Sequence, residues 1–215
     1  MKKITFYLDF ISPYAYLAFE RLPEALMGCT YSVEYKPVLF AAFLKKNGNL
    51  GPAEIPGKRE WTYRQVAWLA QHHGIEMRMP AQHPFNPLPL LRLALACGTD
   101  GLVNRYVSET LFRHVWRGGA DAGDAARLEE LKHRLIPQRD PASDAVKAEL
   151  KANTDEAMAR GVFGVPSTVV DDKVFWGFDA LTMLRECLDN GPWFEGPDWD
   201  RAARLPAGIA RNPAS

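Results

Sequence analysis

The strand-like segments of this chain stand near its two ends, and a long helical stretch separates them. Residues 3–10 and 31–39 alternate and are rich in β-branched and aromatic side chains, which predicts two strands. A helix is predicted between them, because Ser12 can cap it, Pro13 suits its first position and Gly28 can end it. The order strand–helix–strand favours a parallel pair with a right-handed connection.

A loop rich in glycine, asparagine and proline follows at residues 45–58. Beyond it, apolar side chains recur every three or four residues, which is typical of helices. Two further helices are predicted at 125–135 and 143–160. Within the last of these, Asn153 and Glu156 have the spacing of a capping pair.

Strand character returns after the helical stretch. Residues 167–171 and 173–176 are predicted strands joined by a turn at Asp171-Asp172. A final helix is predicted at 179–189, and the tail from residue 192 is expected to lie along the surface or to cross to a partner.

This order of elements predicts an α/β protein with a thioredoxin-like fold. An all-helical domain is inserted between its strand–helix–strand half and its strand–strand–helix half. The predicted thioredoxin-like domain comprises residues 1–43 and 162–215, and the inserted domain comprises residues 44–161.

Charge and cysteine content restrict the function. The 26 Lys and Arg residues equal the 26 Asp and Glu residues, which argues against a nucleic-acid or membrane-surface partner. The apolar N-terminal stretch is too short for a signal peptide and is interrupted by Asp9. Cys29, Cys97 and Cys187 form no C-x-x-C motif, so a reducing, cytoplasmic location is expected. The histidines do not combine with other ligands at metal-binding spacing, so no metal site is expected.

Ser12 is the first candidate for chemistry, because it follows a strand and begins a helix. Free backbone N–H groups and the helix dipole favour a negative charge at that position, and a thiolate there would be stabilised. The local sequence Ser12-Pro13-Tyr14-Ala15 carries no cysteine, so a thiolate would have to come from outside the protein. The alternative is that Ser12 is only a helix cap.

Two other segments could complete such a site. Pro166 stands directly before a predicted strand and is a candidate for a cis peptide bond, with an ordinary trans bond as the alternative. The segment 176–179 (Trp-Gly-Phe-Asp) could offer backbone N–H groups to a carboxylate and a carboxylate to an ammonium group. Asp179 could equally be a helix cap.

Four motifs together resemble a known family. FYLDFISPYAY at 6–16, a Gly-Asn-Leu-Gly-Pro segment ending in Pro-Gly-Lys at 48–58, FGVP at 163–166 and WGFD at 176–179 are similar to the 2-hydroxychromene-2-carboxylate isomerases. These are relatives of the kappa-class glutathione transferases and of DsbA-like proteins.

The resemblance implies a glutathione-dependent homodimer. By position, Ser12 matches the serine that holds the glutathione sulfur. Val165, before Pro166, matches the residue whose backbone pairs with the cysteinyl part, and the segment 176–179 matches the site of the γ-glutamyl end. The implied glutathione-binding residues are Ser12, Asn49, Lys58, Val165, Pro166, Trp176, Gly177, Phe178 and Asp179. The residues alone favour equally a turn position for Asn49 and a solvated side chain for Lys58.

The substrate half of the pattern is not reproduced. In the naphthalene-pathway isomerases a lysine, an Asn-Arg pair and a tyrosine hold the acidic aromatic substrate. The matching positions here are Leu44, Glu54-Ile55 and His83, with Lys45 adjacent. Leu44, Lys45 and His83 are therefore the candidate substrate residues. Apolar walls could come from a set of aromatic residues that could equally be ordinary core: Phe40, Phe43, Trp61, Phe85 and Trp116.

The activity implied is isomerisation of a substrate derived from aromatic ring cleavage, through reversible addition of the glutathione thiolate. A kappa-like glutathione transferase or peroxidase is the alternative enzyme, and a non-catalytic glutathione-binding module is the alternative without catalysis. The apolar tail, with Trp193, Phe194 and Trp199, suggests a surface buried in a homodimer.

Overall fold

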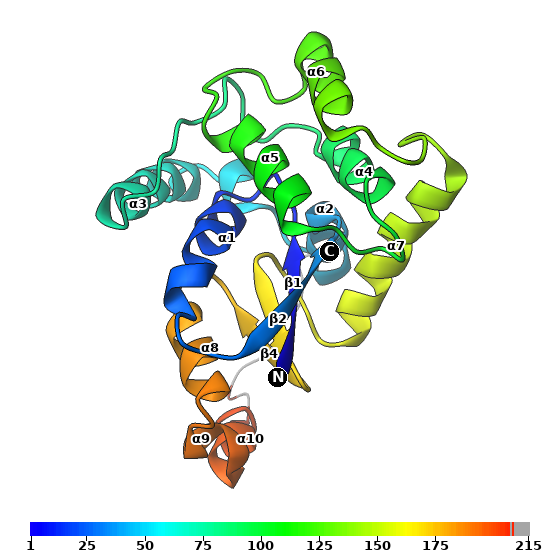
Figure 1. Ribbon diagram of the computed structural model, residues 1–215. Coiled ribbons are helices and arrows are strands. Elements are labelled where there is room, and N and C mark those ends of the chain that lie inside the picture. Colours follow the sequence, from blue (N-terminus) through cyan, green and yellow to red (C-terminus); the bar gives the residue numbers. More distant parts are fainter. Residues whose placement is uncertain (207, 209–215) are drawn as a thin grey trace.

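A four-stranded mixed sheet lies at the centre of the molecule (Figure 1). The computed structural model describes residues 1–206 and 208. The strands are β1 (Lys2–Leu8), β2 (Tyr31–Pro37), β3 (Ser167–Val170) and β4 (Lys173–Trp176), in the order β2-β1-β3-β4. β1 is parallel to β2 and antiparallel to β3, and β3 is antiparallel to β4. The predicted parallel opening unit and the thioredoxin-like fold are confirmed.

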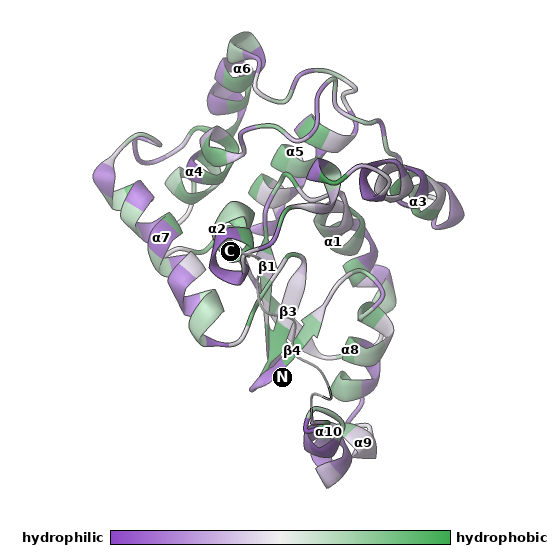
Figure 2. Ribbon diagram, turned by 180° about the vertical axis from the view of Figure 1, so that it is seen from behind, coloured by the Kyte–Doolittle hydropathy of each residue, from purple (hydrophilic) through white to green (hydrophobic). Residues whose placement is uncertain are grey.

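β1 is buried on both faces, so its central residues are apolar almost without interruption. Ile4, Phe6 and Leu8 belong to the larger core cluster, which includes residues of α1, α4 and α5. Tyr7 joins a second cluster that includes residues of α2 and α7. Helices therefore cover both faces of the sheet. Figure 2 shows apolar residues concentrated on the strands and on α4 and α5, whereas α3 is mostly hydrophilic.

The helices follow the predicted pattern, with differences at their ends. The helix predicted at 179–189 begins two residues later, and the loop predicted at 45–58 begins inside α2 and holds the short 3-10 helix η1. The predicted domain boundary between residues 43 and 44 falls inside α2. The helices are α1 (Pro13–Ala25), α2 (Phe40–Asn47), η1 (Pro52–Glu54), α3 (Lys58–His72), α4 (Leu88–Ala96), α5 (Arg105–Trp116), α6 (Ala125–Leu135), α7 (Asp144–Ala159), α8 (Leu181–Leu188), α9 (Pro192–Glu195) and α10 (Pro197–Ala202).

The prediction that Asn153 belongs to a capping pair is wrong. Asn153 lies in the interior of α7, where it is buried, and Ser143 caps that helix. Its side-chain amide donates to the carbonyl oxygens of Pro37 at 3.1 Å and Gly101 at 2.7 Å. The buried Asn153 amide thus connects α7 to the end of β2 and to the segment before α5 through two hydrogen bonds.

The aromatic tail packs against its own chain. Phe194 of α9 is buried, and its ring lies 5.9 Å from that of Phe175 in β4, while Trp199 of α10 lies 5.7 Å from the same Phe175 ring. Trp193 stays partly exposed. The expectation that these side chains form an open surface for a partner is therefore wrong for Phe194. The end of the tail, at 207 and 209–215, lies outside the described residues.

Among the residues that the structure describes, no helix combines the length and the apolarity that a bilayer crossing requires.

Candidate functional site

Ser12 lies at the N-terminus of α1, at the end of the turn that follows β1. Its backbone is extended, and its hydroxyl oxygen accepts a hydrogen bond from the Ala15 backbone N–H at 3.2 Å, so it does cap the helix. The hydroxyl also donates to the carbonyl oxygen of Val165 at 3.4 Å. The first turn of α1 contains no acidic side chain that would compete with an external anion.

A buried carboxyl holds the turn before Ser12. Asp9 is fully buried, and its two oxygens accept hydrogen bonds from the backbone N–H groups of Ile11 at 3.1 Å and Phe40 at 2.9 Å. Burial raises the pKa of this carboxyl to about 7, although its backbone hydrogen bonds act in the opposite direction. Asp9 therefore fixes the path of the chain into the Ser12 position and links it to the start of α2.

The second part of the site is the turn before β3. The Val165-Pro166 peptide bond is cis, as predicted. Val165 and Pro166 are buried, and the contact between Ser12 and Val165 confirms that this turn lies beside the start of α1. The sheet order explains the contact, because β3 pairs antiparallel with β1 and so brings the loop after β1 and the loop before β3 to one end of the sheet.

The third part follows β4. The backbone N–H of Gly177 donates to the Pro166 carbonyl at 2.9 Å, which joins the segment 176–179 to the cis-proline turn. Gly177 has φ +99°, and an added Cβ would come within 2.5 Å of the Asp179 carboxylate. Asp179 does not cap α8, whose capping residue is Ala180 and carries no side-chain hydrogen bond. The Asp179 carboxylate is exposed and is turned toward the Gly177 backbone.

Two exposed rings border this arrangement. The Trp176 ring lies 4.9 Å from that of Phe163, and the two side chains are 54% and 49% exposed. Trp176 lies against Gly164, where an added Cβ would be 2.8 Å from its indole nitrogen. The Phe178 ring packs edge-on against the ring of His73 at the end of α3, with 5.2 Å between the ring centroids.

In the described part of the chain, no hydrogen bond joins Ser12 to the predicted residues Asn49, Lys58, Lys45 and Leu44. Asn49 follows the end of α2, Lys58 begins α3, and both are exposed. Lys45 is also exposed, on the last turn of α2. Leu44 is partly buried, and its side chain would lie 3.4 Å from a Cβ added at Gly51. These four side chains make no hydrogen bond or ion pair with one another in the described part of the chain.

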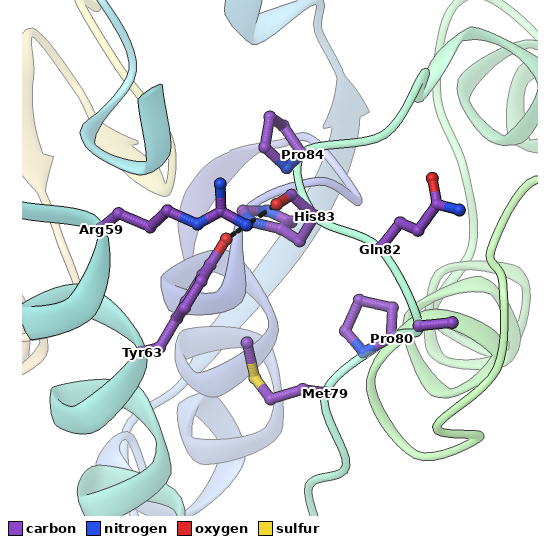
Figure 3. A pocket seen from close by; sticks show the side chains of 8 residues that line it. Arg59, Tyr63, Met79, Pro80, Gln82, His83 and Pro84 are labelled. Carbon is purple, nitrogen blue, oxygen red and sulfur yellow. Dashed lines mark hydrogen bonds between the residues drawn. The ribbon is translucent and has the colours of Figure 1, made fainter. Parts of the chain in front are cut away.

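A cavity of about 530 Å³ lies between the start of α3 and the segment 79–84 (Figure 3). Arg59 and Tyr63, one helical turn apart on α3, line one wall, and His83 lines another. A neighbouring hollow of about 370 Å³ shares Arg59 and Pro84 with it. The first volume falls in the range of pockets that hold small organic ligands. The other residues that line the larger cavity are Met79, Pro80, Ala81, Gln82 and Pro84.

His83 connects this cavity to the Ser12 turn. Its Nε2 lies 2.8 Å from the carbonyl oxygen of Ile11, the residue directly before Ser12. Its Nδ1 lies 2.9 Å from the Tyr63 hydroxyl, and that hydroxyl donates to the His83 carbonyl oxygen at 2.9 Å. Because a carbonyl can only accept, Nε2 carries the proton and Nδ1 is free to accept from Tyr63. Burial lowers the pKa of His83, and the Arg59 charge lowers it further, although the bond to Ile11 opposes them.

Arg59 and Tyr63 were not predicted from the sequence. Figure 3 shows the Arg59 guanidinium beside the Tyr63 hydroxyl and His83, and the guanidinium carbon lies 5.6 Å from the centre of the Tyr63 ring. Their spacing of four residues on a helix that begins at Lys58 places both on one face, a signal that the sequence does contain. Nothing in the sequence showed which segment that face would meet.

The aromatic residues predicted to form apolar walls differ in their burial. Trp116 is fully buried and donates its indole N–H to the Phe10 carbonyl at 2.9 Å, and Phe43 is also core. Trp61 is 62% exposed on α3. Phe85 and Trp116 lie against the His83 ring, at 6.1 Å and 5.5 Å between centroids. Phe85 and Trp116 therefore pack against the His83 ring and do not line the cavity.

The chain and its fold are similar to several known proteins. A family model described as "DSBA-like thioredoxin domain" matches residues 3–189. The chain is 29% identical over 195 residues to a 2-hydroxychromene-2-carboxylate isomerase of Sphingobium xenophagum, covering 87% of this chain and 98% of that protein. It is 26% identical over 217 residues to "Glutathione s-transferase kappa 2" of Caenorhabditis elegans, covering 91% and 95%. A solved 2-hydroxychromene-2-carboxylate isomerase structure superposes with a TM-score of 0.76 at 24% identity, covering 90% of this chain and 97% of that one. The predicted resemblance is confirmed, and these relatives support an enzyme role.

Proposed function

The chain belongs to the DSBA-like thioredoxin domain family, and we propose that within it this protein is a glutathione-dependent isomerase of the 2-hydroxychromene-2-carboxylate isomerase type. One observation carries the proposal. A serine hydroxyl, and no cysteine, occupies the N-terminus of α1 beside the cis-proline turn. Such a site can hold a thiolate that it does not itself supply.

The residues around Ser12 fit glutathione by their chemistry. The Ser12 hydroxyl can turn from the Val165 carbonyl to donate to a sulfur, and the start of α1 favours its negative charge. The Val165 backbone lies beside that position. The exposed Asp179 carboxylate suits the ammonium of a γ-glutamyl group. When bound, glutathione would supply a nucleophilic thiolate for reversible addition to the substrate.

The substrate would occupy the cavity beside this turn. Arg59 is the one lysine or arginine among the residues that line the two hollows, and it can face an acidic group. It would take the place of the polar set that Leu44, Glu54 and Ile55 do not provide. Proline and methionine side chains supply an apolar surface for a flat ring. A substrate derived from aromatic ring cleavage, with one carboxylate, satisfies both parts.

A kappa-like glutathione transferase is the second candidate, because the relative from Caenorhabditis elegans matches over nearly the whole chain and the substrate positions depart from the isomerase pattern. One assay separates the two. The protein is mixed with glutathione and 2-hydroxychromene-2-carboxylate, and both substrate absorbance and free thiol are followed. An isomerase converts the substrate while all thiol is recovered, whereas a transferase consumes thiol in proportion to product. Formation of the isomerised product that is equally fast without glutathione would contradict both.

For assembly we propose a homodimer, as the resemblance implies, and for location the cytoplasm, because the three cysteines form no C-x-x-C motif. Sedimentation velocity at micromolar concentration tests the dimer, and a sedimentation coefficient appropriate to 24.1 kDa would contradict it.

A further inference from the structure

We propose that Tyr63 and His83 form a proton relay, in which the Tyr63 hydroxyl takes a proton from a substrate hydroxyl in the cavity while His83 Nδ1 accepts the proton of Tyr63. The inference deepens the proposed function and rests on it for the substrate class, a cyclic hemiketal. It assigns a catalytic role to Tyr63 and the role of proton acceptor to His83.

The geometry fixes which histidine nitrogen is available. Nε2 must carry a proton because it faces the Ile11 carbonyl at 2.8 Å, so the free lone pair is on Nδ1. That lone pair faces the Tyr63 hydroxyl at 2.9 Å, and the hydroxyl proton can turn to it from the His83 carbonyl oxygen, which lies at the same distance. Proton transfer to Nδ1 leaves both ring N–H groups with acceptors already in place, Ile11 O and Tyr63 Oη. His83 can therefore change charge without any movement of its ring.

Tyr63 is the member of the pair that reaches the substrate. It lines the cavity together with Arg59, whose guanidinium lies at its hydroxyl end (Figure 3). A positive charge there favours partial negative charge on Tyr63 Oη during proton transfer. The surroundings of His83 favour its neutral, proton-accepting form. Arg59 is the charged neighbour, Phe85 and Trp116 are apolar, and burial lowers the pKa of the imidazole.

The step balances within the substrate and these two residues. The hemiketal O–H bond breaks, and its electron pair becomes the second bond of a ketone. The ring C–O bond breaks, and the ring oxygen leaves with the electron pair of that C–O bond as an aryloxide. The proton that His83 holds then returns through Tyr63 to the aryloxide. The product is the ring-opened hydroxyaryl ketone, with no net gain or loss of protons.

The test uses the whole protein and measures ring opening of 2-hydroxychromene-2-carboxylate without glutathione, so that the relay is observed separately from isomerisation. Tyr63→Phe removes the hydroxyl, and Tyr106→Phe, on an exposed tyrosine of α5, is its matched control. His83→Gln can still donate to the Ile11 carbonyl but cannot take up a proton, and His133→Gln is its exposed control. We expect the first member of each pair to lose about 100-fold in rate and each control to keep the wild-type rate.

Two further readouts separate catalysis from support of the fold. The wild-type rate should fall as pH drops through the His83 pKa, which lies below the usual 6.5, because a protonated Nδ1 cannot accept. His83→Gln should remove this dependence. In nitrogen NMR of the free protein, His83 should show a protonated Nε2, and Tyr63→Phe should shift its titration.

The outcomes distinguish the relay from the proposed function. A wild-type protein that opens the ring but does not isomerise the substrate with glutathione supports the relay and refutes the isomerase. A wild-type protein that isomerises, with Tyr63→Phe as fast as Tyr106→Phe or with His83 protonated on Nδ1, overturns the relay alone. A protein that does neither reaction overturns both.

Discussion

Replacing Asp9 by asparagine should make the protein less stable than wild type at pH 4 and more stable than wild type at pH 8. In the folded protein burial raises the pKa of Asp9 from 3.8 to about 7, so the folded chain keeps this proton where the unfolded chain has lost it. The folded state is therefore destabilised as pH rises from 3.8 to 7. The full effect, present above pH 7, is about 4 kcal/mol, since each tenfold change in the proton equilibrium is worth about 1.4 kcal/mol.

Asparagine has the same shape but stays neutral at every pH. Its oxygen can accept from one of the two backbone N–H groups that Asp9 serves, Ile11 and Phe40, and its NH₂ must face the other. A buried N–H without a partner costs about 1–3 kcal/mol. The variant should therefore be less stable than wild type by about 1–3 kcal/mol at pH 4. At pH 8 it should be more stable by a similar amount, because the penalty of the charged carboxyl is gone.

The measurement is urea unfolding followed by tryptophan fluorescence at several pH values between 4 and 8. Asp200→Asn, on the exposed side of α10, is the control and should differ from wild type by the same small amount throughout. A stability difference between Asp9→Asn and wild type that does not change with pH would refute the account of Asp9 as a destabilising buried carboxyl.

Three other substitutions test the packing and the site. Phe194→Ala should lower the free energy of unfolding by about 3–5 kcal/mol in thermal or urea unfolding, because its ring is buried against Phe175; a loss below about 1 kcal/mol would show that the tail does not pack on the sheet. Asn153→Leu should cost about 2–4 kcal/mol, since two buried carbonyls lose their donor, and an unchanged unfolding curve would contradict that role. Gly177→Ala should weaken glutathione binding measured by calorimetry, because φ +99° and the nearby Asp179 carboxylate leave no room for a Cβ; unchanged affinity would place the γ-glutamyl site elsewhere.

The fold and the Ser12 half of the site could be predicted because they follow from chain order. The strand–helix–strand and strand–strand–helix halves must share one sheet, and pairing of β3 with β1 then places Val165 beside Ser12. The motif around Ser12 is continuous in sequence, so the sequence alone shows both the capping residue and the missing cysteine.

The cavity could not be predicted in the same way. Tyr63 and His83 belong to a helix and a loop with no periodic relation, and their contact depends on how α3 is placed against the segment 79–84. The spacing of Asn153 to Glu156 misleads for a related reason. It fits a cap, but capping requires a helix end, and α7 runs from Asp144 to Ala159 with Ser143 as its capping residue.

The burial of the aromatic tail could not be predicted from the sequence either. Composition marks Phe194 and Trp199 as apolar side chains that must be buried, but it does not say by what. In the folded chain β4 covers them, through Phe175. Phe194, expected on a surface for a partner, is thus part of the protein's own core.

The central claim is that Ser12 lowers the pKa of a bound glutathione thiol, and the most direct test is the ultraviolet absorbance of the thiolate against pH. Ser12→Ala removes both the cap of α1 and the donor to sulfur, so it cannot separate the two roles. Ser12→Asp keeps an acceptor for the Ala15 N–H but places a negative charge against the thiolate. We predict that in wild type the bound thiol ionises near neutral pH, and that Ser12→Asp unfolds at the wild-type temperature but leaves the thiol protonated there. A stable Ser12→Asp protein whose bound glutathione titrates as in wild type would show that Ser12 is only a helix cap.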